Sequence, residues 1–191
     1  MPHLKKRSSV QYLTVCALFA ALIAVLSPIA IPLGPIPISL GLLGVLITAA
    51  TLPSVESFTA VAVFIGLGVC GLPVFSGGGS GAIFLVGPTG GYLWSYLLVA
   101  PLVGLLIRSS RRAAMSHSHA SIFATSLACL AGVAVCYLCG IAQYMLLTQA
   151  SLYSALTVCV LPFLSFDIAK AILAACLATK LNKLQVLRKY S

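Results

Sequence analysis

Residues 12–31 read YLTVCALFAALIAVLSPIAI, twenty consecutive positions without a charged side chain. A helix needs about 20 mostly apolar residues to cross the hydrocarbon core of a bilayer. The rest of the chain has the same character, because 61% of its 191 residues are hydrophobic and 7% are charged, against about 25% charged residues in an average soluble domain. This composition excludes a soluble globular domain. It also excludes a disordered chain, which requires low hydrophobicity and high charge.

Six apolar stretches follow one another along the chain, and we expect each to form one membrane-spanning helix. They cover residues 12–31, 39–52, 57–74, 91–107, 121–147 and 154–178. The second stretch is short for a span and needs help from its flanks or from a thin local bilayer. The predicted fold is all-α, a six-helix transmembrane bundle in a single domain over residues 1–191. Short tails are expected at about 1–11 and 180–191.

The basic residues predict the orientation of this bundle. Ten of the eleven fall in three clusters, at residues 5–7, 108–112 and 180–189. With both termini in the cytoplasm, all three clusters lie on the cytoplasmic side, as the positive-inside rule requires. The net charge of +9 is spread between apolar stretches rather than along one face, so it does not indicate nucleic-acid binding. A basic start before an apolar run is also typical of a signal peptide, but this run is longer than a signal sequence and lacks a clear cleavage pattern. We therefore expect a multi-pass protein of the cell membrane, in contact with the lipid bilayer.

Asp167 and Lys170 are the two charged residues inside these predicted spans. An ionised group at the centre of a membrane helix costs at least about 2.5–3.5 kcal/mol on insertion scales, and such residues are usually functional. The i, i+3 spacing puts both side chains on one helix face. A helix that begins near Pro162 would carry both in its first turns, where its dipole favours Asp and disfavours Lys. The simpler interpretation is an internal ion pair for packing, whereas the functional one is a site where an anionic ligand from outside offsets Lys170.

Two loops on the outer side border the same region. The glycine-rich stretch 71–93 contains Gly77 and Gly78, which permit a sharp turn, and Thr89, which is suited to cap the following helix. It lacks the Gly-Lys-Ser/Thr of a phosphate-binding loop. Residues 28–39 contain four prolines, which forbid a regular helix, and such backbone is tolerated at membrane depth where it lines a cavity. We expect a pocket there, with the N-termini of the second, fourth and sixth helices directed towards it; a plain external hairpin is the simpler alternative.

Small residues recur along the first stretch at Ala17, Ala20, Ala21 and Ala24. Such stripes let helices approach closely in lipid, and the sequence leaves open whether they serve internal packing or docking to another membrane protein. The seven cysteines all lie in apolar stretches. Cys136 and Cys139 have the spacing of half a zinc site, but nothing completes it. No metal and no cofactor are expected.

Two motifs resemble those of the BioY family, the biotin-capturing S components of energy-coupling factor (ECF) transporters. They are Gly87-Pro-Thr-Gly-Gly-Tyr-Leu93, preceded by Gly-Leu-Pro-Val-Phe-Ser-Gly-Gly, and Pro162-Phe-Leu-Ser-Phe-Asp-Ile-Ala-Lys170. The resemblance covers most of the chain. It implies six helices, cytoplasmic termini and an outward biotin site closed by the outer loops. It also implies that the alanine stripe meets a transmembrane coupling subunit, itself bound to two ATPase subunits.

The resemblance also implies roles for single residues. Asp167 would accept hydrogen bonds from the ureido N–H groups of biotin, and Lys170 would donate to its carboxylate or to its ureido oxygen. Tyr92 would border the ring system. The lid and wall would be formed by backbone from two segments, comprising Phe75, Ser76, Gly77 and Gly78, and Gly87, Pro88, Thr89, Gly90 and Gly91. This chain departs from the common family pattern Pro-Val-Pro-Val-Thr-Leu-Gln, since it reads Pro-Ile-Pro-Ile-Ser-Leu-Gly over residues 35–41. Ser39 keeps a hydroxyl in the site, but Gly41 replaces the Gln amide, and Ser95 stands where a glycine is common.

The expected function is high-affinity binding and uptake of biotin, with no chemistry performed by the chain itself. Uphill transport then needs partners, because no ATP-binding motif is present. Two alternatives stay open at this stage: an S component for another small vitamin, such as thiamine or riboflavin, and an intramembrane enzyme that uses Asp167 and Lys170 as an acid–base pair.

Overall fold

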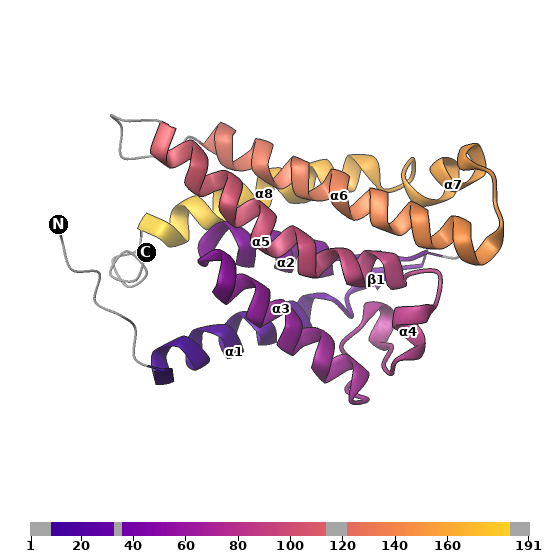
Figure 1. The fold of residues 1–191 in the computed structure, drawn as a ribbon, viewed down its shortest axis with the longest axis horizontal. Coiled ribbons are helices and arrows are strands. Elements are labelled where there is room, and N and C mark those ends of the chain that lie inside the picture. The colour runs from indigo at the N-terminus through magenta and orange to yellow at the C-terminus, as the bar shows by residue number, and fades with distance from the viewer. Residues whose placement is uncertain (1–8, 33–35, 114–121, 184–191) are drawn as a thin grey trace.

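The computed structural model describes residues 9–32, 36–113 and 122–183, and its regular elements are almost entirely helical (Figure 1). The basic residues 5–7, 188 and 189 lie outside the described residues. The elements in chain order are α1 (Ser9–Leu26), β1 (Ala30–Ile31), β2 (Ile38–Ser39), α2 (Gly41–Thr51), α3 (Ser54–Val69), the 3₁₀ turn η1 (Ser76–Gly78), α4 (Ile83–Val86), α5 (Gly90–Ala113), α6 (Ile122–Thr148), α7 (Leu152–Cys159) and α8 (Leu164–Lys183).

Three helices, α1, α5 and α6, are long and apolar enough to cross a membrane, and a fourth span results if α7 and α8 are counted together. Helices α2 and α3 are apolar but shorter. Each predicted stretch thus contains helix, which confirms the helical fold class. The structure does not confirm six helices long enough to span the membrane. Helix α2 is short because Pro53 and the prolines before residue 38 confine it on both sides. All eleven of its residues are buried, in packing against α8, α5, α1 and α3.

The sixth predicted stretch is not one helix. Helix α7 ends at Cys159, α8 begins at Leu164, and the two axes are bent by 53°. Pro162 lies in the break, where it cannot supply the backbone N–H that a continuous helix would need. The expectation of one continuous helix over residues 154–178 was therefore wrong, although the start of a helix just after Pro162 was right.

The hairpin, α4 and the break before α8 lie at the opposite end of the bundle from the basic ends of α5 and α8. In Figure 1 the β1–β2 hairpin, α4 and the α7–α8 break lie towards the right, whereas the N-terminus of α1 and the C-termini of α5 and α8 lie towards the left. The hairpin pairs Ala30 with Ser39 and Ile31 with Ile38 in antiparallel register, and it packs against η1. The proline-rich loop thus satisfies part of its backbone by pairing with itself beside the glycine-rich turn.

A second acidic residue is buried besides Asp167. Glu56 lies in the first turn of α3 and is 7% exposed, and its carbonyl oxygen accepts a weak hydrogen bond from Cys16 Sγ. The predicted third span began at residue 57 and so left Glu56 outside it, whereas α3 begins at Ser54 and includes Glu56 in its first turn.

Candidate functional site

A buried ion pair lies at the start of α8. Lys170 Nζ is 2.7 Å from Asp167 Oδ1, and both residues are at most 7% exposed. The second carboxylate oxygen, Oδ2, accepts a hydrogen bond from the Tyr137 hydroxyl on α6 (2.7 Å). Lys170 Nζ also donates to the carbonyl oxygen of Ser39 in β2 (2.8 Å). Each charge therefore has an opposite charge and a neutral partner, the arrangement in which burial of ions is tolerated.

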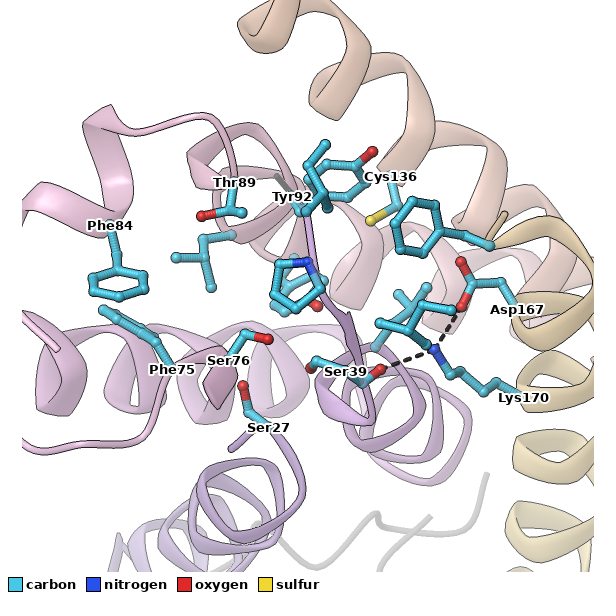
Figure 2. Close-up of a pocket in the computed structure, with 17 residues that line it drawn as sticks. Ser27, Ser39, Phe75, Ser76, Phe84, Thr89, Tyr92, Cys136, Asp167 and Lys170 are labelled. Atoms are coloured by element: carbon cyan, nitrogen blue, oxygen red, sulfur yellow. Dashed lines mark hydrogen bonds and ion pairs between the residues drawn. The ribbon is translucent and has the colours of Figure 1, made fainter. Parts of the chain in front are cut away.

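The pair faces a cavity of about 610 Å³, counted up to and including its mouth. Ligand pockets for small molecules combine apolar walls with a few polar groups, and the lining of this cavity has the same composition. Figure 2 shows Asp167 and Lys170 on one side of this cavity and Phe75 and Phe84 on the other. Seven residues predicted as binding residues line it: Ser39, Phe75, Ser76, Thr89, Tyr92, Asp167 and Lys170. Three helix N-termini meet at the cavity, as predicted. Thr89 and Phe163 directly precede α5 and α8, and Ser39 lies two residues before the start of α2.

Aromatic packing holds the glycine-rich segment over the cavity. Phe75 is fully buried, with its ring edge-on to Phe64 (5.8 Å between ring centroids) and next to Phe84 (5.8 Å). The Phe75 ring occupies the place that a side chain at residue 68 would need, so only Gly68 fits there. Ser76 follows directly, and its hydroxyl is buried without a hydrogen-bond partner among the described residues.

The glycines of the predicted lid and wall do not contact the cavity. Gly77, Gly78, Gly87, Gly90 and Gly91, together with Pro88, are absent from its lining. Gly77 and Gly78 have positive φ angles of 69° and 78° and form the turn at η1. Gly90 and Gly91 instead allow α5 to approach the carbonyl oxygens of Leu85 and Cys139, where a side chain would clash.

One amide on α6 fixes the segment before α5. Gln143 Nε2 donates to the carbonyl oxygens of Leu85 (2.9 Å) and Gly87 (2.8 Å). This pair of hydrogen bonds satisfies backbone that lies outside the long helices, where unpaired carbonyls are costly. The GPTGG motif therefore acts in this structure through close packing of α5 against α6, and only Thr89 of it reaches the cavity.

Tyr92 connects three elements at the cavity wall. Its ring packs against α6 at Gly140, where any side chain would collide with it. Its hydroxyl donates to the carbonyl oxygen of Cys159 (2.8 Å), the last residue of α7. Because that carbonyl lies at a helix C-terminus, it has no intrahelical donor. Tyr92 thus lines the cavity as predicted and also anchors the broken helix.

The sequence analysis missed other residues of the site. Tyr137 gave no signal, because a tyrosine in an apolar helix resembles any core aromatic. The missed lining residues are Ser27, Ile36, Pro37, Ile38, Leu42, Phe84, Leu93, Tyr96, Cys136 and Phe163. The proline-rich loop had been expected to border the pocket, and Ile36–Ile38 belong to it. No group of three or more His, Cys, Asp or Glu side chains that could hold a metal ion occurs among the described residues.

The alanine stripe of α1 divides between inside and outside. Ala20 is buried in the core, so it serves internal packing and cannot form an outer docking surface as had been predicted. Ala17 and Ala21 are exposed, and Ala24 is half-buried. The outward-facing part of the stripe therefore consists of Ala17 and Ala21.

Comparison with known proteins agrees with the fold and identifies the family. The sequence model of the BioY family matches residues 2–186. The biotin transporter BioY of Thermotoga maritima is 38% identical over 171 residues, which cover 90% of this chain and 95% of that protein. The biotin transporter BioY of Rhodobacter capsulatus is 36% identical, covering 86% and 90% respectively. The crystal structure of the S-component for biotin from an ECF-type ABC transporter superposes with a TM-score of 0.83, at 28% identity over 96% of this chain and 95% of that one. A match of this extent to the family, in sequence and in fold, shows that the chain belongs to the BioY family.

Proposed function

We propose that this protein captures biotin in the cavity at the start of α8 and delivers it to an energised transporter. The observation that carries the proposal is the buried Asp167–Lys170 pair, which faces a cavity whose lining is otherwise mostly apolar. Relatives named as biotin transporters, and the structural likeness to a biotin S-component, support the same substrate. The chain performs no chemistry on the ligand.

The polar groups of the cavity suit the two polar ends of biotin. Its ureido ring has two N–H donors, and its carboxylate ends a flexible four-carbon chain. Asp167 has both oxygens oriented by Tyr137 and Lys170, so it can accept from the ureido N–H groups without searching for a conformation. Lys170 uses one donor on Asp167 and one on Ser39, which leaves its third N–H for the ligand. Tyr92 and Phe163 border the apolar body between the ends.

The proposed setting is the cell membrane, with six helical segments crossing or entering the bilayer, both termini in the cytoplasm and the cavity outside. The basic ends of α5 and α8 support this orientation, because they lie at the end of the bundle away from the cavity (Figure 1) and the positive-inside rule places them in the cytoplasm. The partners proposed are a transmembrane coupling subunit and two ATPase subunits, since none of the motifs found binds ATP.

The experiment that tests the function is isothermal titration of the purified protein in detergent with biotin, thiamine and riboflavin. We expect saturable binding of biotin and no heat of binding with the other two vitamins. Binding of another vitamin in preference to biotin would contradict the proposed substrate, and a change in the recovered biotin would contradict a pure capture role.

Lys170 is expected to pair with the carboxylate of biotin, because the amine is the only side-chain cation lining the cavity among the described residues. Biotin methyl ester should bind the wild type at least about tenfold more weakly than biotin, a loss of about 1.4 kcal/mol. The same ester should lose much less in Lys170→Met, since the discriminating partner is already absent. Titration of both ligands into both proteins forms a double-mutant-style cycle that isolates this coupling. Equal losses in both backgrounds would place the carboxylate away from Lys170.

A further inference from the structure

Ser39 and Leu42, on either side of the first residue of α2, line the cavity beside Lys170. The N–H of Gly41 donates to Ser39 Oγ (2.8 Å), and the N–H of Gly44 donates to the carbonyl oxygen of Leu40. The N–H groups of Leu42 and Leu43 have no acceptor among the described residues. Free N–H groups and the positive end of the helix dipole make such a terminus favourable for an anion. By itself this applies to any helix start, so a second feature is needed.

That second feature is the Ser27 side chain. Ser27 follows α1, lines the cavity and is 2% exposed. Its hydroxyl has no hydrogen-bond partner within the described parts of the chain. A Cβ placed at Gly41 would lie 2.9 Å from Ser27 Oγ and 3.0 Å from Ser39 Oγ, so both hydroxyls converge on the first residue of α2. Figure 2 shows Ser27 and Ser39 on the same wall, with Lys170 reaching the Ser39 carbonyl from the other side.

The hydroxyls of Ser27 and Ser39 on this wall can each donate a hydrogen bond, and neither has an acceptor among the described residues. Ser39 Oγ accepts from Gly41 and keeps its own O–H to donate, and Ser27 has a free O–H. Because both serines line the cavity, a ligand there can supply the acceptor that these hydroxyls lack, and hydrogen bonds from them would favour a ligand with acceptor atoms at this wall. The glycine at residue 41 makes the arrangement fit, because any larger residue would push both hydroxyls aside. Where the family pattern has a Gln amide, this chain has Ser27 packed over a bare helix N-terminus.

Resting on the proposed binding of biotin, we propose that Ser27, Ser39 and the N-terminus of α2 form a carboxylate subsite that determines specificity for the ionised ligand. The carboxylate accepts from the Ser27 and Ser39 hydroxyls and from the free N–H groups of α2. Lys170 is held beside it by the Ser39 carbonyl and supplies the full positive charge. The ureido ring then extends towards Asp167 and Tyr137. Ser27 thus discriminates a carboxylate from a neutral end group.

The test compares biotin with biotinol, which replaces the carboxylate by a neutral alcohol, on Ser27→Ala and Gly41→Ala proteins in detergent. Hydrogen bonds to charged groups are stronger than neutral ones, so biotin should bind Ser27→Ala roughly tenfold or more weakly. Biotinol should change by less than about threefold, because neutral hydrogen bonds are about half as strong. Gly41→Ala should give the same selective loss by displacing both hydroxyls. The matched control is Ser54→Ala, since Ser54 is also a buried serine whose hydroxyl lacks a partner among the described residues, but it lies just beyond the far end of α2.

The outcomes separate this inference from the function on which it rests. Equal losses for biotin and biotinol, or no loss in Ser27→Ala, overturn the subsite while leaving biotin capture in place. A selective loss in Ser54→Ala of the same size also overturns it, because the effect would then not be local. A wild-type protein that binds no biotin overturns the proposed function itself. A selective loss of biotin binding in both Ser27→Ala and Gly41→Ala supports the subsite.

Discussion

Asp167→Asn is expected to weaken biotin binding at least about tenfold, equivalent to about 1.4 kcal/mol. The substitution keeps the shape of the side chain but removes the charge, and charge-assisted hydrogen bonds are roughly twice as strong as neutral ones. The amide would also present one N–H donor towards a ligand edge that itself donates. Tyr137 and Lys170 hold the two carboxylate oxygens of Asp167 in place, so the wild-type site is preorganised and the loss should appear directly in affinity.

Glu56→Gln is the matched control for this prediction. It makes the same change from acid to amide at the other buried acid of the chain, in the first turn of α3 and away from the cavity lining. Titration with biotin, combined with a thermal unfolding scan of each variant, separates loss of affinity from loss of folding. Unchanged affinity in folded Asp167→Asn, or an equal loss in Glu56→Gln, would remove Asp167 from the binding site.

Replacing Ala17 and Ala21 together with Trp should abolish biotin uptake by cells while the purified protein still binds biotin. Both residues are exposed on α1. The lining of the cavity includes Ser27, which directly follows α1, but no residue of α1 itself. Small residues on an outward face allow another helix to approach closely, and two indole rings would prevent it. The effect on uptake should therefore be complete, because the proposed energy source lies in the partner subunits.

The control for bulk itself is Ala134→Trp. Ala134 is exposed on α6, so the same substitution adds the same ring to a different outer face, and uptake should persist. Copurification of the coupling subunit with each variant measures assembly directly. If the α1 variant copurifies normally, or if it loses biotin binding in detergent, the stripe serves internal packing rather than docking.

The sequence predicted the parts of this fold that depend on local chemistry. The apolar runs gave the helices, Pro162 marked the start of α8, and the motifs around Tyr92 and Asp167 gave the BioY family, which the family match confirmed. The spacing of Asp167 and Lys170 predicted one helix face, and the two side chains form an ion pair on it. These features depend on residues close together in the chain, so the pattern alone was sufficient.

The features that could not be predicted from the sequence depend on how helices distant in the chain are rotated against each other. No local pattern shows that Tyr137 on α6 reaches Asp167 on α8, or that Ser27 packs over Gly41. The glycines of the GPTGG motif were read as ligand contacts, although Gly90 and Gly91 fit α5 against α4 and α6. The proline that marked α8 also implied the break before it, so the expectation of one continuous helix over residues 154–178 conflicted with a signal already in the sequence.

The burial of α2 has a consequence for how the chain is made. A helix of eleven residues rises only about 16 Å, well short of a hydrocarbon core of about 30 Å, and all the residues of α2 are buried. Helix α8, among its main neighbours, comes last in the chain and is translated more than a hundred residues later. During synthesis α2 must therefore wait, incompletely sheltered, until the C-terminal helix arrives. The same event delivers Asp167 and Lys170, so a nascent chain acquires its buried ion pair and its completed core in a single step.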